Sequence, residues 1–360
     1  MRVLQLIDSL DAGGAERVAV NIANALSLDE SVVSYLCTTR KEGLLKSSLS
    51  KNVGYLFLNK KSTFDISAIK KLFQFLKNDK IDIIHAHSSS FFLAVIMRFL
   101  NSNIHVIWHD HYGNSEFLEQ RKSKMLCIFS RYFSHNICVN NSLKDWSKGY
   151  LKTANVTYLP NFAVKDSFKP STFLKGVEGK RILHLANLRP QKDHVTLLNA
   201  FREVIKEFPE YTLHCVGKNF DDDYSKQIMK NVYELGLSNN VFFYGSKKDI
   251  CNIISQSNVC VLSSKSEGLP IALLEYGLGE KPVVTTNVGN CAQVIENGVN
   301  GIIVDKEEPR LLAEGLIHIL KNEEKARTYA QQLKTKVKNL YSQEAYTSKL
   351  ISIYNSVINA

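Results

Sequence analysis

The chain has 360 residues, a length that suggests two domains. Hydrophobic residues make up 44% and charged residues 22%, which excludes a disordered, collagen-like or simple coiled-coil protein. The net charge of +10, most of it carried by the first 165 residues, favours acidic partners such as phosphates, nucleotides or anionic lipids.

The cysteine pattern and the hydropathy indicate a compartment. The seven cysteines show no C-x-x-C spacing and most lie in apolar runs, which favours a reduced chain over a disulfide scaffold or a zinc ribbon. The longest apolar candidate for a membrane span, 91–100, has ten residues and includes Arg98. The chain enters a strand-like run directly, without the pattern of a signal peptide. We therefore expect a cytoplasmic protein.

Short apolar runs alternate with amphipathic segments along the first half of the chain. This rhythm predicts a parallel sheet with helices on both faces. The expected strands are 3–7, 32–37, 81–86 and 104–108, and the expected helices are 15–26, 69–76 and 91–100.

The apolar periodicity is interrupted between 156 and 180 by two prolines and two glycines, which predict a linker. The same rhythm then restarts. We expect strands at 180–186, 212–216, 241–244, 259–262, 282–285 and 301–304, a helix at 195–208, and helices after residue 310.

These patterns predict an α/β fold with two Rossmann-like, doubly wound domains. The N-terminal domain is expected over 1–165 and the C-terminal domain over 166–340, with a final helix over 341–360 that packs back on the first domain. Ligands of open parallel sheets bind beyond the carboxyl ends of the strands, so two such sheets predict one shared central cleft.

The strongest motif runs from 259 to 275. A buried strand ends near Ser264, and Pro270 suits the first position of a helix, whose free amides and dipole would form an anion site. Glu267 lies before that helix and Glu275 about 7 Å along its axis. Carboxylates on either side of a diphosphate suit the hydroxyls of a ribose and a sugar. The alternative is a solvated glutamate pair, for which the flanking leucines leave little room.

Two other loops follow the first strand of each half. Arg189 and Lys192 lie after the strand of the second half, and both suit a diphosphate, although exposed loop cations are common. Gly13 and Gly14 separate the first strand from the first helix and allow a ligand to approach the backbone. They are not part of a G-x-G-x-x-G fingerprint, which disfavours a dehydrogenase.

Two H-x-H pairs follow strands, His85 with His87 and His109 with His111. Rings on one face hint at a metal, but neutral, hydrogen-bonded histidines are the commoner outcome, and we expect no metal. His109, just past its strand, is a candidate for contact with a transferred group. The D-x-D in 221–223 could hold Mg²⁺, but loop solvation and helix N-terminal charge explain it better.

Taken together, these motifs resemble a known family. The Glu267/Glu275 pair, the turn at 189–192, the Gly13-Gly14 loop and the run 281–289 are similar to the family 4 retaining glycosyltransferases of the GT-B fold, also described as glycosyl transferases group 1. The resemblance spans roughly 3–305 and is strongest over 181–305. It departs from the family pattern at Asn187, where an arginine is usual, and at Gln293, where a glutamate is usual.

The resemblance implies roles for individual residues. Glu275 would bind the ribose of a nucleotide-sugar donor and Glu267 the donor sugar, while Arg189 and Lys192 neutralise the diphosphate leaving group. The implied catalytic residues are His109, Glu267, Arg189 and Lys192. The implied donor-binding residues are Gly13, Gly14, Arg189, Lys192, Tyr244, Gly245, Glu267, Gly268, Leu269, Pro270, Ile271 and Glu275.

We therefore expect a metal-independent retaining glycosyltransferase that moves a sugar from a nucleotide sugar, preferably a UDP-sugar, to a glycan or lipid-linked acceptor in cell-surface polysaccharide synthesis. No cofactor and no nucleic-acid partner are expected. The alternatives are a nucleotide-sugar epimerase of the same fold and a non-catalytic nucleotide-binding protein. The segments 70–80 and 117–133 are both basic and apolar, so they either dock on the anionic inner face of the cell membrane or pack as ordinary helices.

Overall fold

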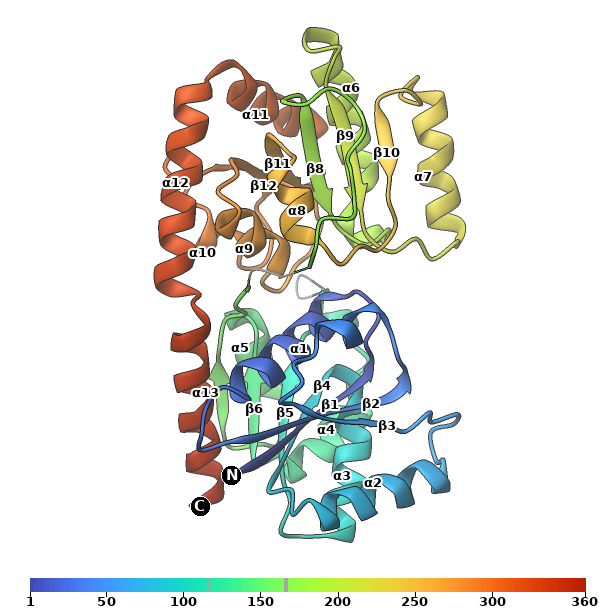
Figure 1. Ribbon diagram of the computed structural model, residues 1–360, viewed down its shortest axis with the longest axis vertical. Helices are drawn as coiled ribbons and strands as arrows, with labels where there is room; N and C mark the ends of the chain where they lie inside the picture. Colours follow the sequence, from blue (N-terminus) through green and yellow to red (C-terminus); the bar gives the residue numbers. More distant parts are fainter. Residues whose placement is uncertain (115–116, 165–167) are drawn as a thin grey trace. The chain divides into compact units, whose positions relative to one another are not determined.

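The computed structural model describes residues 1–114, 117–164 and 168–360 (Figure 1). It divides into two compact units, one made of Met1–Phe162 with Gln343–Ala360 and the other of Ala163–Ser342. The boundary expected between residues 165 and 166 falls outside the described residues. Each unit contains one parallel sheet flanked by helices.

The first unit has a seven-stranded sheet in the order β3-β2-β1-β4-β5-β6-β7. The order reverses between β1 and β4, and such a switch point is where doubly wound sheets bind ligands. The strands are β1 (Arg2–Ser9), β2 (Val33–Lys41), β3 (Gly54–Phe57), β4 (Ile83–His87), β5 (His105–Asp110), β6 (His135–Cys138) and β7 (Val156–Tyr158). The α-helices are α1 (Gly14–Leu26), α2 (Ile66–Asn78), α3 (Phe91–Leu100), α4 (Lys124–Phe129), α5 (Asn141–Tyr150) and α13 (Gln343–Ile358).

The second unit repeats this plan with six strands in the order β10-β9-β8-β11-β12-β13, and its switch point lies between β8 and β11 (Figure 1). The strands are β8 (Arg181–Leu185), β9 (Thr212–Val216), β10 (Val241–Phe243), β11 (Val259–Leu262), β12 (Val283–Thr286) and β13 (Ile302–Val304). The α-helices are α6 (His194–Glu207), α7 (Asp223–Glu234), α8 (Ile250–Ser255), α9 (Ile271–Leu278), α10 (Cys291–Val294), α11 (Pro309–Lys321) and α12 (Glu323–Leu340).

Burial explains why these segments form a sheet. All four residues of β11 and of β12 are buried, as expected for parallel strands covered on both faces. The predicted linker over 156–180 is wrong at its start, because β7 pairs with β6 there.

The basic segment 70–80 lies largely in α2, which buries Leu72 and Leu76 against the sheet. It therefore packs as an ordinary amphipathic helix on one side. Within the described residues, no helix combines the length and the apolar character needed to cross a membrane.

Candidate active site

The loop between β11 and α9 holds the central carboxylate of the second unit. Glu267 is only 5% exposed, and its Oε1 accepts hydrogen bonds from Ser264 Oγ at 2.6 Å and Lys192 Nζ at 2.5 Å. Lys192 comes from the turn after β8, so the fold brings two predicted site residues into direct contact. A buried carboxylate needs such partners, because burial penalises an unpaired charge.

The start of α9 offers free backbone donors. Pro270 is the N-cap of the helix, one residue before the position that we expected for it, and it provides no side-chain cap. Among the described residues, the amides of Ile271 and Ala272 have no hydrogen-bond partner. Together with the helix dipole, they favour an anion.

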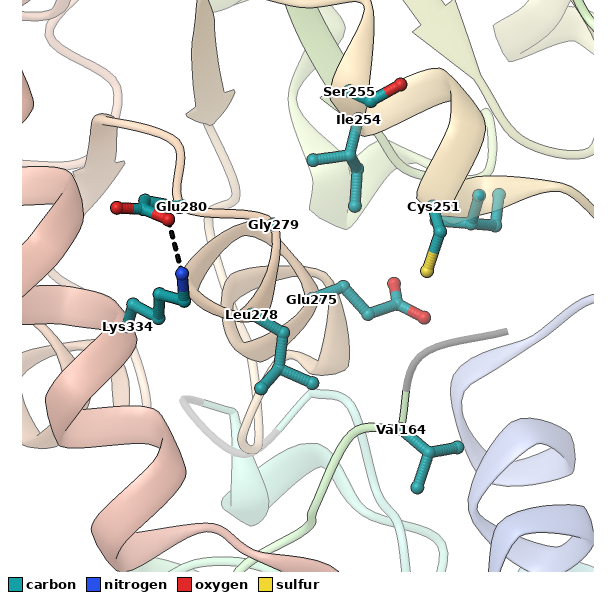
Figure 2. Close-up of a pocket in the computed structure, with 10 residues that line it drawn as sticks. Val164, Cys251, Ile254, Ser255, Glu275, Leu278, Gly279, Glu280 and Lys334 are labelled. Atoms are coloured by element: carbon teal, nitrogen blue, oxygen red, sulfur yellow. Dashed lines mark hydrogen bonds and ion pairs between the residues drawn. The ribbon is translucent and has the colours of Figure 1, made fainter. Parts of the chain in front are cut away.

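Glu275 occupies a different environment, a cavity of about 210 Å³ between α8, α9 and α12. Figure 2 shows its carboxylate directed toward Cys251 and Val164, while Glu280 pairs with Lys334 on the other side of α9. Glu267 and Glu275 therefore lie in different surroundings within the second unit.

Arg189 is exposed, and its Cζ lies 4.7 Å from the centre of the Phe220 ring. The structure therefore places the Arg189 guanidinium against the loop before α7. Asn187, which breaks the family pattern, accepts a hydrogen bond from the Lys218 amide at 2.7 Å and joins the loops after β8 and β9. Sequence reasoning did not predict this role, which requires the neighbouring strand.

The turn after β8 contains a strained residue. Asp193 has a φ of 48° and caps α6 by accepting from the Thr196 amide and hydroxyl. Lys265 lies 3.7 Å from Asp193, pairs with Glu307 at 2.8 Å, and has a raised pKa because of the Glu307 hydrogen bond. Left-handed backbone at a polar residue is typical of functional turns. Lys265 is a cation beside the predicted phosphate turn that the motif analysis missed.

Gly289 allows two site loops to touch. Its φ is +53°, and a Cβ at this position would lie 2.1 Å from the carbonyl oxygen of Glu267. The next residue, Asn290, donates its amide to the Gly268 carbonyl at 2.9 Å. The glycine is therefore required both by its backbone angle and by the close approach.

Of the predicted donor-binding residues Tyr244 and Gly245, the tyrosine side chain is committed elsewhere. The Tyr244 hydroxyl accepts from the Lys175 amide at 2.8 Å and lies 3.0 Å from His214 Nδ1, so this side chain ties the start of the unit to β9. Gly245 has a φ of +64°, and a Cβ added to it would have no described atom within 4 Å. The backbone at Gly245 is therefore open to a ligand.

In the first unit, Gly13 caps α1 without a side-chain bond, and a Cβ added to Gly14 would have no atom within 4 Å. The loop after β1 is therefore open to a ligand at Gly14. The D-x-D of the second unit is a helix cap, because Asp222 accepts from the Ser225 amide and hydroxyl.

Four histidines form a stack at the ends of β4 and β5. The ring centres of His109 and His111 are 4.0 Å apart, and those of His85 and His87 are 4.7 Å apart. Burial lowers the pKa of His85 and of His111 to about 3, and it lowers the pKa of His87 and His109 in the same direction. All four rings are therefore neutral at neutral pH.

The structure places the predicted contact residue, His109, fully inside this stack. His111 is the partly exposed member, and sequence reasoning gave it no separate role. Ring nitrogens of His85, His87 and His109 lie within 4.8 Å of one another and could hold a metal ion. However, His85 Nε2 lies 3.2 Å from His109 Nδ1, and His87 Nε2 lies 2.9 Å from Gln5 Oε1, so hydrogen bonds already occupy these atoms.

Two protein-family models match the chain, one over each half. The model described as Glycosyltransferase Family 4 matches residues 12–164, and the model described as Glycosyl transferases group 1 matches residues 167–336.

Full-length relatives are distant in sequence. The chain is 24% identical over 324 residues to an uncharacterized glycosyltransferase of Haemophilus influenzae, covering 87% of this chain and 88% of that protein. It is 24% identical over 332 residues to the UDP-Gal:alpha-D-GlcNAc-diphosphoundecaprenol alpha-1,3-galactosyltransferase of Escherichia coli. This match covers 85% of this chain and 84% of that protein.

Solved structures share the fold. Anabaena Alr3699/HepE in complex with UDP and glucose superposes with a TM-score of 0.83 at 18% identity, over 99% of this chain and 100% of that chain. Sucrose-phosphate synthase from Thermosynechococcus elongatus superposes with a TM-score of 0.81 at 16% identity, over 100% of this chain and 100% of that chain. The predicted fold class and enzyme class are confirmed: the chain is a glycosyltransferase of the GT-B fold, with a Glycosyltransferase Family 4 domain followed by a Glycosyl transferases group 1 domain.

Proposed function

We propose that this enzyme transfers a sugar, with retention of configuration and without a metal ion, from a UDP-sugar to a glycan or lipid-linked acceptor in cell-surface polysaccharide synthesis. The observation that carries the proposal is the Lys192–Glu267 contact in the loop that leads into α9. It puts a cation, a carboxylate and the start of a helix with free amides in one loop cluster.

This cluster suits the diphosphate of the donor. Phosphate oxygens attract Lys192 more strongly than one carboxylate does, because a diphosphate carries more charge. The amides of Ile271 and Ala272 add hydrogen bonds that need no metal. Once Lys192 turns to the diphosphate, Glu267 Oε1 is available to accept a hydrogen bond from a donor-sugar hydroxyl.

Glu275 suits the ribose of the donor. Its carboxylate lines a cavity whose other walls include the apolar side chains of Ile250, Ile254 and Leu278. Such a setting gives a ribose hydroxyl pair a carboxylate acceptor beside apolar walls. A uridine donor is supported by the Escherichia coli relative, whose name specifies UDP-Gal, and by the Anabaena structure, which contains UDP and glucose.

The chemistry follows from the leaving group. Departure of UDP concentrates negative charge on the diphosphate, and fixed donors at that place lower the barrier. We assign this stabilisation to Lys192, to Arg189 and to the α9 amides. In the donor complex, Glu267 keeps its hydrogen bond from Ser264 and accepts one from the donor sugar, so we propose that it acts as a hydrogen-bond acceptor and not as a covalent nucleophile. The acceptor then attacks on the face that UDP leaves.

A lipid-linked acceptor requires access to a membrane, and we place the enzyme on its cytoplasmic face. Phe64 and Ile66 are 69% and 66% exposed at the start of α2. The Phe64 ring packs edge-on against Phe92 at 5.6 Å, and Phe92 packs against Phe129 of α4 at 5.3 Å. Aromatic contacts therefore link the start of α2 through α3 to α4. We propose that this apolar patch, together with the basic residues of the two segments, meets an anionic lipid headgroup layer.

A thermal-shift panel of nucleotide sugars tests the donor. A UDP-sugar present at 100 times its Kd should stabilise the enzyme by about 2.7 kcal/mol. Glu275→Ala should abolish most of this stabilisation. Glu280→Ala, which changes the other acidic residue of the same cavity, should keep it. Equal responses of the two variants would remove the ribose assignment.

Product analysis tests the reaction. With a polyprenyl-diphosphate-linked N-acetylglucosamine as acceptor and EDTA present, we expect a new α-linked disaccharide from an α-configured donor. Release of UDP without any glycosylated product would favour the epimerase. Binding of vesicles that contain phosphatidylglycerol should weaken in Phe64→Ser and stay unchanged in Tyr233→Ser, which changes an even more exposed aromatic residue of the second unit.

A further inference from the structure

One chain of hydrogen bonds runs through the histidine stack and joins three strands of the first unit to the C-terminal helix α13. Its members are side chains only, and each internal polar atom has a partner. In order along the chain of bonds, they are His111, His87, Gln5, Tyr354, His85 and His109.

The inner half runs from Gln5 to His109. Gln5 Nε2 donates to Tyr354 Oη at 3.3 Å, and Tyr354 Oη lies 2.6 Å from His85 Nδ1. Because the phenol already accepts from Gln5, its own proton goes to His85 Nδ1. A neutral imidazole has one N–H and one lone pair, so His85 Nε2 then donates to His109 Nδ1 at 3.2 Å. The proton of His109 therefore sits on Nε2.

The outer half runs from Gln5 to His111. Gln5 Oε1 accepts from His87 Nε2 at 2.9 Å, which leaves the lone pair of His87 on Nδ1. That lone pair accepts from His111 Nε2 at 2.9 Å. The lone pair of His111 is therefore on Nδ1, which has no hydrogen-bond partner among the described residues and is not enclosed.

The two ends of the chain have opposite character in this arrangement. The alternative, in which Tyr354 accepts from both neighbours, leaves a buried hydroxyl proton without an acceptor, and buried donors are rarely left unpaired. Rotation of the Gln5 carboxamide by half a turn would reverse every bond and exchange the two ends together. The roles of His109 and His111 are thus coupled through Gln5 and Tyr354.

We propose that Gln5 and Tyr354 fix the free ring nitrogens of the two histidines in opposite roles, so that His109 Nε2 is a donor and His111 Nδ1 an acceptor. His109 Nε2 is buried and has no hydrogen-bond partner in the part of the chain that the structure describes, so a ligand oxygen that reaches it would complete its bonding. Resting on the proposed function, His111 Nδ1 accepts from the attacking hydroxyl of the acceptor. Tyr354 is then a positioning residue, supplied by a helix that is distant in the sequence.

Nitrogen-15 NMR of the full-length, histidine-labelled enzyme tests the tautomers directly, because protonated and unprotonated ring nitrogens have well-separated shifts. His109→Gln and His111→Gln assign the signals. We expect a protonated Nε2 in both residues of the wild type. Protonation of either residue on Nδ1 would overturn the proposal, and so would one equivalent of zinc bound to the stack and lost in His85→Gln.

Tyr354→Phe removes the hydroxyl of the chain. Tyr346→Phe is a matched control on the same helix, because Tyr346 is also buried and its hydroxyl has no partner among the residues that the structure describes. Tyr354→Phe should shift the ring nitrogens of His85 and His109 toward mixed tautomers, and Tyr346→Phe should not. Gln5→Met, which cuts the chain at its centre, should disturb His87 and His85 together. Unchanged nitrogen shifts in folded Tyr354→Phe would refute the coupling.

Kinetics test the consequence for transfer. Tyr354→Phe should lower kcat about tenfold and change the KM for the UDP-sugar little. The control Tyr346→Phe should keep the kcat of the wild type. An inactive wild type would contradict the proposed function and leave the NMR result to decide the tautomers. A fully active Tyr354→Phe with mixed tautomers would remove the positioning role.

Discussion

The Nζ atom of Lys192 lies 2.5 Å from Oε1 of Glu267, so the cation and the carboxylate that the motifs assign to different parts of one substrate neutralise each other. This contact connects the loop after β8 with the loop after β11, on the two sides of the switch point of the sheet. A donor that binds there has to replace each of these side chains as the partner of the other. Removing either charge leaves the other one unpaired, and donor affinity should respond to both changes.

Lys192→Met should weaken UDP binding about 10- to 100-fold, the equivalent of a charge-assisted hydrogen bond of about 1.5–3 kcal/mol. The loss has two sources, the missing cation and the unpaired charge of Glu267. The double variant Lys192→Met/Glu267→Gln should therefore recover part of the affinity. Calorimetry with UDP measures both. Lys206→Met, which removes an exposed lysine paired with Glu203, should bind as the wild type does, and an equal loss there would contradict the assignment.

Gly289→Ala should lower the free energy of unfolding by more than the strain of a positive φ alone. Its Cβ would collide with the Glu267 carbonyl, so the loop has to move, whereas Gly298, with a φ of +74°, has no atom within 4 Å of that position. Gly298→Ala should lose about 1 kcal/mol of unfolding free energy from backbone strain. Gly289→Ala should lose more and should also weaken UDP-sugar binding. Thermal unfolding with and without the donor separates the two effects, and identical behaviour would argue against the close approach.

The sequence predicted the second sheet well for a physical reason. Strands buried on both faces, such as β11 and β12, read as unbroken apolar runs, so their places follow from hydropathy. The strands β3, β6 and β7 have only three or four residues, and β6 contains His135 and Asn136. Length alone does not decide whether a strand is recognised, because β10 and β13 also have three residues, consist only of apolar side chains and were predicted. The strand β7 contains Thr157 and precedes Pro160, which is why it was included in a linker.

The candidate site was predictable where its chemistry is local. Glu267 and Lys192 follow strand ends, so their approach follows from parallel topology. Tyr354 and Gln5 are 349 positions apart, and no local pattern joins them. Asn187 is informative only beside Lys218, on a neighbouring strand end. Residues that act through tertiary partners are therefore the ones that the motifs missed.

Asp110→Asn should destabilise the first unit by about 3 kcal/mol, because it breaks a buried pair and leaves Arg121 without a counter-charge. Both oxygens of Asp110 accept from Arg121, at 2.7 and 2.8 Å, and the guanidinium also lies 4.4 Å from the ring centre of Trp146. The chain has two tryptophans, Trp108 and Trp146, so their fluorescence reports urea unfolding of this unit alone.

The matched control for that variant is Glu42→Gln, which breaks the exposed pair with Lys46 in the same unit and should change the urea midpoint little. A comparable midpoint in the two variants would show that the Asp110–Arg121 pair contributes no more than a surface contact.

Acid should destabilise the first unit through its histidine stack. Burial holds the pKa of His85 and His111 at about 3, whereas the same rings in the unfolded chain bind a proton below about 6.5. Because the unfolded state then binds more protons, the stabilising contribution is complete above pH 6.5 and is lost as the pH falls toward 3, by about 1.4 kcal/mol per pH unit for each ring. Urea unfolding monitored by tryptophan fluorescence between pH 7.5 and 5 measures this slope. His85→Gln should make it shallower by one proton, whereas an unchanged slope would mean that the ring is accessible to protons in the folded enzyme.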